Sequence, residues 1–231
     1  VRCKACFYME QVEGIKFPSI PGFNINEATD ILLKRDFDKY REIGEPHPFL
    51  VAKGRDFLIP FSHEHFELWT QSLHFGAKDR LNFVEPKTNL KVGGGLDDVW
   101  LNINTNCLHI VDYKSTSQKS DKGPITLDDP WKASYKRQMD LYVWVLRKKG
   151  FHVDDVGYFL YCDGDRFSEY DFLSSTTASM NFKITLIDYK TNDTWIEPTL
   201  QDISECLNES KRPLHSDYCE YGKFLTQSLN Q

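Results

Sequence analysis

The chain has 231 residues, and 40% of them are hydrophobic, which is enough apolar material for a buried core. Its 28 Lys and Arg residues and 34 Asp and Glu residues leave a net charge of −6, so the composition is not that of a typical basic nucleic-acid-binding protein. No apolar run approaches the roughly 18 to 20 residues that a membrane span needs, and the start of the chain lacks the pattern of a signal peptide. We therefore expect no membrane partner.

Six cysteines are scattered along the chain. A chain of this length does not need disulfides to hold a core together, so we interpret the cysteines as reduced and expect a cytoplasmic location. The spacing of Cys3 and Cys6 is the one that fits a metal or redox site.

Hydrophobic periodicity and turn residues predict an α/β protein with a mixed sheet flanked by helices. We expect one domain over residues 1–231, with a helical segment at about 1–80, a core at about 90–190 and a C-terminal helix and tail at about 195–231. In chain order, the predicted elements are helices at 24–44 and 63–76, strands at 90–103 and 107–115, a helix at 131–150, strands at 155–162, 167–173 and 182–190, and a helix at 198–213.

The tripeptide Asp-Tyr-Lys occurs twice, at 112–114 and at 188–190, each time after an apolar pair. The midpoint between Asp97 and Asp112 falls inside the polar turn at 104–106, so a hairpin would place the two aspartates almost opposite each other. Carboxylates this close repel each other unless a cation lies between them, and Mg²⁺ or Mn²⁺ is the natural occupant. The second copy has no such partner, and we interpret it as a solvated strand end.

The alternation of side chains along a strand places Lys114 on the same face as Asp112. The side chain of Tyr113 then points to the other face, although its backbone carbonyl can still reach a metal ion. On the helix that follows, Gln138 and Tyr142 lie four residues apart and project from one side. A Gln and a Tyr at this spacing are commonly surface and core-edge residues, but next to a metal site they can orient a phosphate or brace the site.

These motifs, in this order, resemble the PD-(D/E)XK nuclease superfamily and in particular its RecB-type branch, which includes the exonucleases of CRISPR spacer acquisition. The branch has Gly-x-apolar-Asp, then Asp/Glu-x-Lys, then Gln-x-x-x-Tyr. Here the corresponding segments are Gly94 to Asp97, Asp112 to Lys114, and Gln138 to Tyr142. The opening segment, CKACFYMEQVEGI, is similar to the first helix of that branch.

The resemblance implies a restriction-endonuclease-like core and an exonuclease-like, metal-dependent hydrolysis of DNA. The implied catalytic residues are Asp97, Asp112, Lys114, Gln138 and Tyr142. The implied ligands of Mg²⁺ or Mn²⁺ are Asp97, Asp112 and the carbonyl of Tyr113. The pathway, whether DNA repair, phage recombination or CRISPR adaptation, is left open, and so is the choice between single- and double-stranded DNA.

Two departures from the family pattern concern metal ligands. Where the branch usually has a histidine ligand on an early helix, this chain has Asp30, with Glu27 as the neighbouring alternative. An aspartate suits Mg²⁺ or Mn²⁺, although an acidic residue in the first turns of a helix also complements the helix dipole.

The second departure concerns an iron–sulfur cluster, which some relatives hold with four cysteines. Cys3, Cys6, Cys206 and Cys219 suffice by number, but Gly222 stands where a Cys-x-x-Cys partner of Cys219 would fall. The spacing therefore argues against a cluster and favours core positions for these cysteines.

Two other interpretations remain open. The chain can be a catalytically inactive nucleic-acid-binding or assembly module on a nuclease fold, or a cysteine–metal module such as a redox sensor.

Overall fold

The structure is a computed structural model, and it describes residues 3–17, 24–70, 81–119 and 123–229. The chain divides into two compact units. The sheet unit comprises residues 23–84 and 91–193, and the terminal unit comprises residues 1–22, 85–90 and 194–231. Two short strands, β2 (Asn82–Glu85) and β3 (Leu90–Gly93), pair with each other where the chain passes between the two units.

The sheet unit is built on a five-stranded mixed sheet with the strand order β1-β4-β5-β6-β9. The neighbouring strands are antiparallel except for β5 and β6, which run parallel. The bounds of the strands are β1 (Leu58–Pro60), β4 (Asp98–Asn102), β5 (Cys107–Thr116), β6 (Val156–Gly164) and β9 (Phe182–Lys190). A separate short pair, β7 (Leu173–Ser174) and β8 (Thr177–Ala178), precedes β9.

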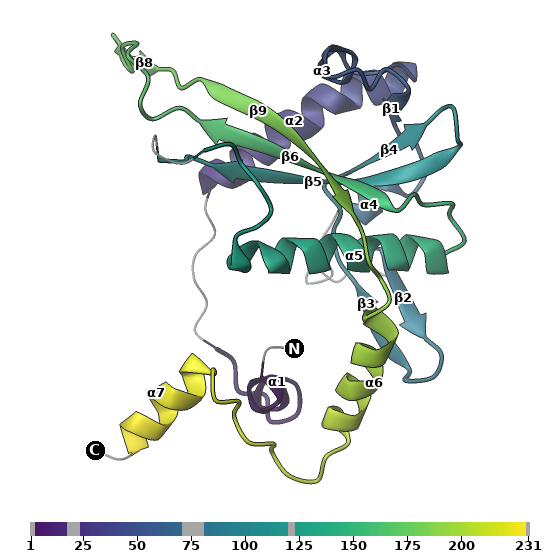
Figure 1. The fold of residues 1–231 in the computed structure, drawn as a ribbon, viewed down its shortest axis with the longest axis vertical. Helices are drawn as coiled ribbons and strands as arrows, with labels where there is room; N and C mark the ends of the chain where they lie inside the picture. Colours follow the sequence, from purple (N-terminus) through teal and green to yellow (C-terminus); the bar gives the residue numbers. More distant parts are fainter. Residues whose placement is uncertain (1–2, 18–23, 71–80, 120–122, 230–231) are drawn as a thin grey trace. The chain divides into compact units, whose positions relative to one another are not determined.

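Helices cover both faces of this sheet (Figure 1). On one face, α2 (Asn24–Ile43) places Phe37 against Trp100 and Tyr113 in a core that also includes α3 (Pro48–Ala52). The other face is covered by α5 (Ala133–Lys148), which follows a single 3₁₀ turn at Pro130–Lys132. The sheet accommodates α5 closely, because a Cβ atom at Gly157 would lie 2.6 Å from the sulfur of Met139.

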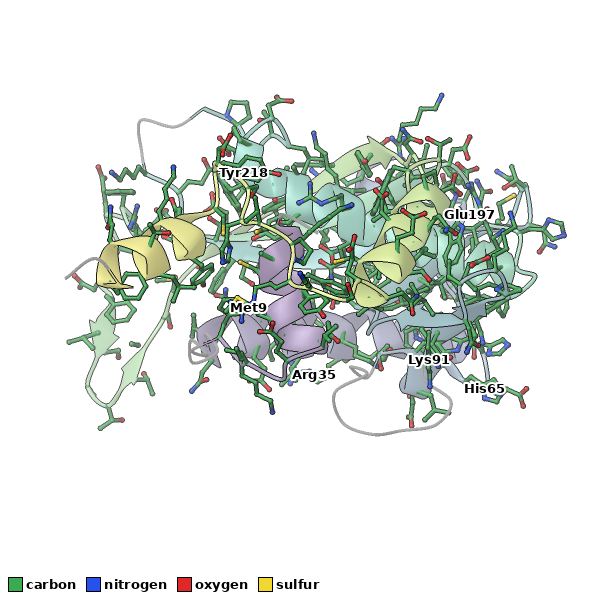
Figure 2. All side chains as sticks on the ribbon, turned by 90° about the horizontal axis from the view of Figure 1, so that it is seen from below. Met9, Arg35, His65, Lys91, Glu197 and Tyr218 are labelled. Carbon is green, nitrogen blue, oxygen red and sulfur yellow. The ribbon has the colours of Figure 1, made fainter. Side chains whose placement is uncertain are left out.

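The terminal unit contains the two ends of the chain. Its helices are α1 (Lys4–Gln11), α6 (Ile196–Leu207) and α7 (Glu220–Leu229). Helix α1 lies between α6 and α7 in Figure 1, and Figure 2 shows the same order from below, with Met9 of α1 labelled. The hydroxyl group of Tyr8 donates a hydrogen bond of 3.1 Å to the carbonyl of Glu209, and Glu13 forms an ion pair with Arg212. Segments about 200 residues apart in sequence therefore pack together.

Most of the predicted elements are present. The predictions for the helices at 24–44 and 131–150 and for the strand at 182–190 are confirmed within one or two residues. Of the helix predicted at 63–76, the described part contains only the short helix α4 (Phe66–Trp69), and residues 71–76 lie outside the described ranges. Across the described residues, no helix combines the length and the apolar character that crossing a bilayer requires.

Two strand predictions are wrong in detail. The strand expected at 90–103 is divided into β3 and β4, because the N–H groups of Gly94 and Leu96 bond to Leu81 and Trp69 and not to a neighbouring strand of the main sheet. The strand expected at 167–173 is absent apart from Leu173. Strand β6 pairs along its whole length with β9, so the residues that follow β6 are not needed as its antiparallel partner.

Candidate active site

Asp97 and Asp112 lie across the β4–β5 hairpin from each other. The register pairs Asp98 with Val111, and one further residue along each of the two segments places Asp97 opposite Asp112. The backbone N–H of Tyr113 donates a hydrogen bond of 2.7 Å to Oδ2 of Asp97, which fixes this carboxylate beside β5. The turn between the strands is held by Asn102, whose side-chain oxygen accepts from the N–H groups of Asn104 and Thr105.

Lys114 lies on the same face of β5 as Asp112, beside the two aspartates. Its ammonium group forms an ion pair with Oδ2 of Asp112 and donates to the carbonyl of Tyr113 at 3.2 Å. It also lies 4.7 Å from the centre of the Tyr135 ring on α5. Two carboxylates, one ammonium group and one backbone carbonyl thus converge within a few residues of β5.

Asp30 approaches the same cluster from α2. The hydroxyl group of Thr29, the preceding residue, forms a hydrogen bond with the hydroxyl group of Ser115 at the end of β5. This contact brings the next residue near the site: burial raises the pKa of Asp112, and the charge of Asp30 adds to that rise. Within the described ranges, Oδ1 of Asp30 is buried without a hydrogen-bond partner. Glu27, the other candidate, is exposed one turn earlier.

Burial and mutual repulsion make it unfavourable for all the carboxyl groups of this site to be ionised at once. Burial, followed by the charge of Asp112, raises the pKa of Asp97 to about 7. Burial, followed by the charge of Asp97, raises the pKa of Asp30 to about 7 as well. Burial alone would lower the pKa of Lys114, but the charges of Asp112 and Asp97 outweigh it and raise that pKa.

When ionised, the three aspartates carry three negative charges against the one positive charge of Lys114. The excess of two negative charges in a largely buried place is the charge that one divalent cation neutralises. Oxygen-only donors suit Mg²⁺ or Mn²⁺. The donor set and the unsatisfied oxygen of Asp30 therefore fit such an ion.

Gln138 and Tyr142 also interact on α5, as their spacing predicted. The side-chain NH₂ group of Gln138 donates a hydrogen bond of 2.9 Å to the hydroxyl oxygen of Tyr142. The Tyr142 ring packs directly over Gly94, where an added Cβ atom would lie 2.8 Å from the ring. Burial raises the pKa of Tyr142 to about 12, and the charges of Asp97 and Asp112 contribute to this shift. The three motifs thus meet at one place, where the absence of a side chain at Gly94 leaves room for the ring of Tyr142.

The sequence reasoning missed the role of Asp98. This side chain is fully buried on the opposite face from Asp97, where it accepts hydrogen bonds from the hydroxyl of Tyr113 at 2.7 Å and from the indole N–H of Trp100 at 3.1 Å. It also forms an ion pair of 2.5 Å with Arg41 of α2. The pair Asp97-Asp98 therefore separates into one residue that faces the site and one that binds α2 to the sheet. The alternation of side chains along a strand was the signal that could have distinguished them.

The second Asp-Tyr-Lys copy lies on β9, with both ionic side chains exposed. Asp188 forms an ion pair of 2.9 Å with Arg55, and in the sheet it lies opposite Tyr158 of β6. The prediction of a solvated strand end for Asp188 and Lys190 is confirmed.

Of the four cysteines considered for an iron–sulfur cluster, three lie together in the structure and Cys206 lies apart from them. Cys206 is buried in α6, and its thiol points to the carbonyl of Lys4 at 3.8 Å. Cys3, Cys6 and Cys219 do gather in the terminal unit, and the residue that completes their group is His215. His215 was missed because it stands 209 residues from Cys6 and has no motif partner close to it except Cys219.

Comparison of the chain with known protein families, with curated proteins and with solved structures gave no match. The nuclease resemblance accordingly rests on the three motifs and on the arrangement of their residues.

Proposed function

We propose that the protein is a metal-dependent phosphodiester hydrolase that acts on DNA, with a restriction-endonuclease-like core. The observation that carries the proposal is the convergence of Asp30, Asp97, Asp112 and Lys114 at one end of β5. A cluster that existed only for stability would not bury three carboxylates around one ammonium group, because burying unbalanced charge is costly. Such arrangements are typical of functional sites.

Asp97, Asp112, Asp30 and the carbonyl of Tyr113 are the groups that would hold Mg²⁺ or Mn²⁺. Such an ion supplies Lewis-acid stabilisation of a phosphate and makes water a better nucleophile at neutral pH. Lys114 contributes a fixed positive charge beside Asp112, where it can orient a water molecule and offset the negative charge that develops on the phosphate. Gln138 and the hydroxyl of Tyr142 supply neutral polar groups that position the substrate or brace the site.

A groove beyond the C-terminal end of β5 supports a nucleic-acid substrate. It has a volume of about 320 Å³, and its lining includes Thr116 of β5, the exposed Lys119 and Arg166, and the half-exposed indole of Trp131. Cationic side chains neutralise phosphates, and an aromatic ring can stack on a base, so this combination suits a single strand. The basic groups are local, which reconciles a nucleic-acid substrate with the net charge of −6.

The six free thiols are compatible with a reducing cytoplasm.

The test is a cleavage assay on end-labelled single- and double-stranded DNA with Mg²⁺, with Mn²⁺ and without divalent cations. The chain offers a matched control, because Asp-Tyr-Lys occurs on β5 and again on β9. We expect Lys114→Ala to lower cleavage by roughly 10²- to 10³-fold, the usual loss when one group that stabilises developing charge is removed. Lys190→Ala on β9 should leave cleavage unchanged.

Two results would contradict the proposal. One is cleavage that persists in Asp112→Asn and in Lys114→Ala, which would place the chemistry elsewhere. The other is DNA binding without cleavage in either metal, which would favour the catalytically inactive binding module.

A further inference from the structure

Four potential ligand atoms gather in the terminal unit, whereas the carboxylate site belongs to the sheet unit. The sulfur atoms of Cys3, Cys6 and Cys219 and Nδ1 of His215 all lie within 4.8 Å of one another. Nδ1 of His215 is 3.5 Å from the sulfur of Cys3, 3.7 Å from that of Cys6 and 3.5 Å from that of Cys219. The sulfur atoms of Cys6 and Cys219 are 3.3 Å apart.

These separations are close to the edges of a tetrahedron around a single zinc ion. With Zn–S bonds of about 2.3 Å and Zn–N bonds of about 2.0–2.1 Å, neighbouring ligand atoms lie roughly 3.5 Å apart for a sulfur–nitrogen edge and roughly 3.8 Å apart for a sulfur–sulfur edge. We propose that Cys3, Cys6, His215 and Cys219 bind one Zn²⁺ ion in a closed, structural Cys₃His site.

The same distances argue against a four-iron cluster. Such a cluster gives each thiolate its own iron and holds the thiolates apart by the width of the cluster. Here Cys6 and Cys219 are close enough to share one ion. A fourth cysteine is not available either, because Cys206 points to the carbonyl of Lys4. Three thiolates and one imidazole are a donor set that zinc favours.

The backbone around the cluster supports thiolate ligands. The N–H of Gly222 points to the sulfur of Cys219 at 3.3 Å, and the N–H groups of Cys6 and Ser216 hydrogen-bond to the thiol of Cys3. Hydrogen bonds to metal-bound sulfur fix the orientation of the ligands and tune the site.

Gly222 explains why histidine is the fourth ligand. A Cβ atom at this position would lie 2.6 Å from Cβ and Cγ of His215, so a side chain there would collide with the imidazole. The residue that departs from a Cys-x-x-Cys spacing is thus the residue that makes room for His215. The pair His215 and Cys219, with three residues between them, then faces the pair Cys3 and Cys6.

Zinc at this site would join the two ends of the chain. Cys3 is the residue before α1, and Cys6 lies in the first turn of that helix. His215 and Cys219 precede α7. The apolar cluster around them is small and consists of Cys3, Ala5, Cys219 and the adjacent Cys6. Small units with little core commonly depend on a metal ion for their stability.

The experiment measures metal content and ligand geometry in the full chain. The protein is purified under reducing conditions without chelators, and zinc and iron are quantified by plasma mass spectrometry. We expect one zinc ion per chain and no acid-labile sulfide. Replacement of zinc by Co²⁺ should give the visible absorption of a tetrahedral ion together with thiolate charge-transfer bands.

Variants separate a ligand set from a general effect on folding. His215→Ala and Cys219→Ser should lose the zinc ion, whereas His215→Cys, which restores a fourth ligand, should retain it and shift the Co²⁺ spectrum. Cys206→Ser, a buried cysteine outside the cluster, and Lys114→Ala should both retain zinc. Zinc content that is unaffected in His215→Ala, iron with acid-labile sulfide in place of zinc, or reduced protein that holds no metal would each overturn the proposal.

Discussion

The carboxylate site should make the protein less stable as pH rises, and Asp97→Asn should remove much of this effect. Burial and the charge of Asp112 raise the pKa of Asp97 from 3.8 to about 7. A raised pKa in the folded state means that stability is fully present below the unfolded pKa and is lost as pH rises towards the folded pKa. For Asp97, this loss occurs between about pH 4 and about pH 7.

The magnitude follows from the size of the shift. Each pKa unit corresponds to about 1.4 kcal/mol, so ionised Asp97 costs on the order of 4 kcal/mol above pH 7 when no cation is bound. At pH 5 the same group costs only about 1.5 kcal/mol. The asparagine side chain of the Asp97→Asn variant carries no charge, and its oxygen can still accept the hydrogen bond from the N–H of Tyr113. We therefore expect the stability of Asp97→Asn relative to wild type to increase by about 3 kcal/mol between pH 5 and pH 8.

The assay is urea unfolding of both proteins at pH 5 and pH 8 in buffer free of divalent cations. Tryptophan fluorescence reports mainly on the sheet unit, because four of the five tryptophans belong to it, with Trp195 as the exception. Adding Mn²⁺ at pH 8 should stabilise wild type and not Asp97→Asn. The exposed Asp188→Asn serves as the control and should follow wild type within about 1 kcal/mol. Parallel pH dependence in wild type and Asp97→Asn would refute the reasoning.

Two further predictions concern the surroundings of the site. Gly94→Ala forces the ring of Tyr142 to move, because the new Cβ atom would lie 2.8 Å from it; we expect a loss of roughly 1–3 kcal/mol in the free energy of unfolding and up to about 10²-fold in cleavage. Gly123→Ala, with open space around it, should change neither quantity. Replacing both Lys119 and Arg166 by Ala should weaken DNA binding. It should also lower the magnitude of the slope of log affinity against log salt by roughly 1.4, the contribution of two phosphate contacts on a single strand. An unchanged slope would show that DNA does not bind in this groove.

Local sequence patterns predicted the elements that position the carboxylate site. The midpoint of Asp97 and Asp112, which lies within the turn, was enough to predict that they face each other, because antiparallel pairing relates residues by the sum of their positions. The i, i+4 spacing of Gln138 and Tyr142 likewise predicted a contact that the structure contains.

Contacts between distant segments were not predictable in the same way. Nothing next to Asp30 indicates that Thr29 will bind Ser115, 86 residues later, and so bring Asp30 to the end of β5. The division of the expected 90–103 strand depends on hydrogen bonds from Gly94 and Leu96 to two segments that precede them in the chain.

By itself, the sequence determined the helices and strands around the carboxylate site, which Asp-Tyr-Lys copy has partners, and that Tyr113 turns away from Asp112. These features depend on repeats of two or about 3.6 residues along one element. Tertiary structure alone decided that Asp98 binds Arg41 and that His215 joins Cys3 and Cys6. Each of these contacts joins residues from 57 to 212 positions apart, and local periodicity contains no information about which of many distant groups the folded chain brings within bonding distance.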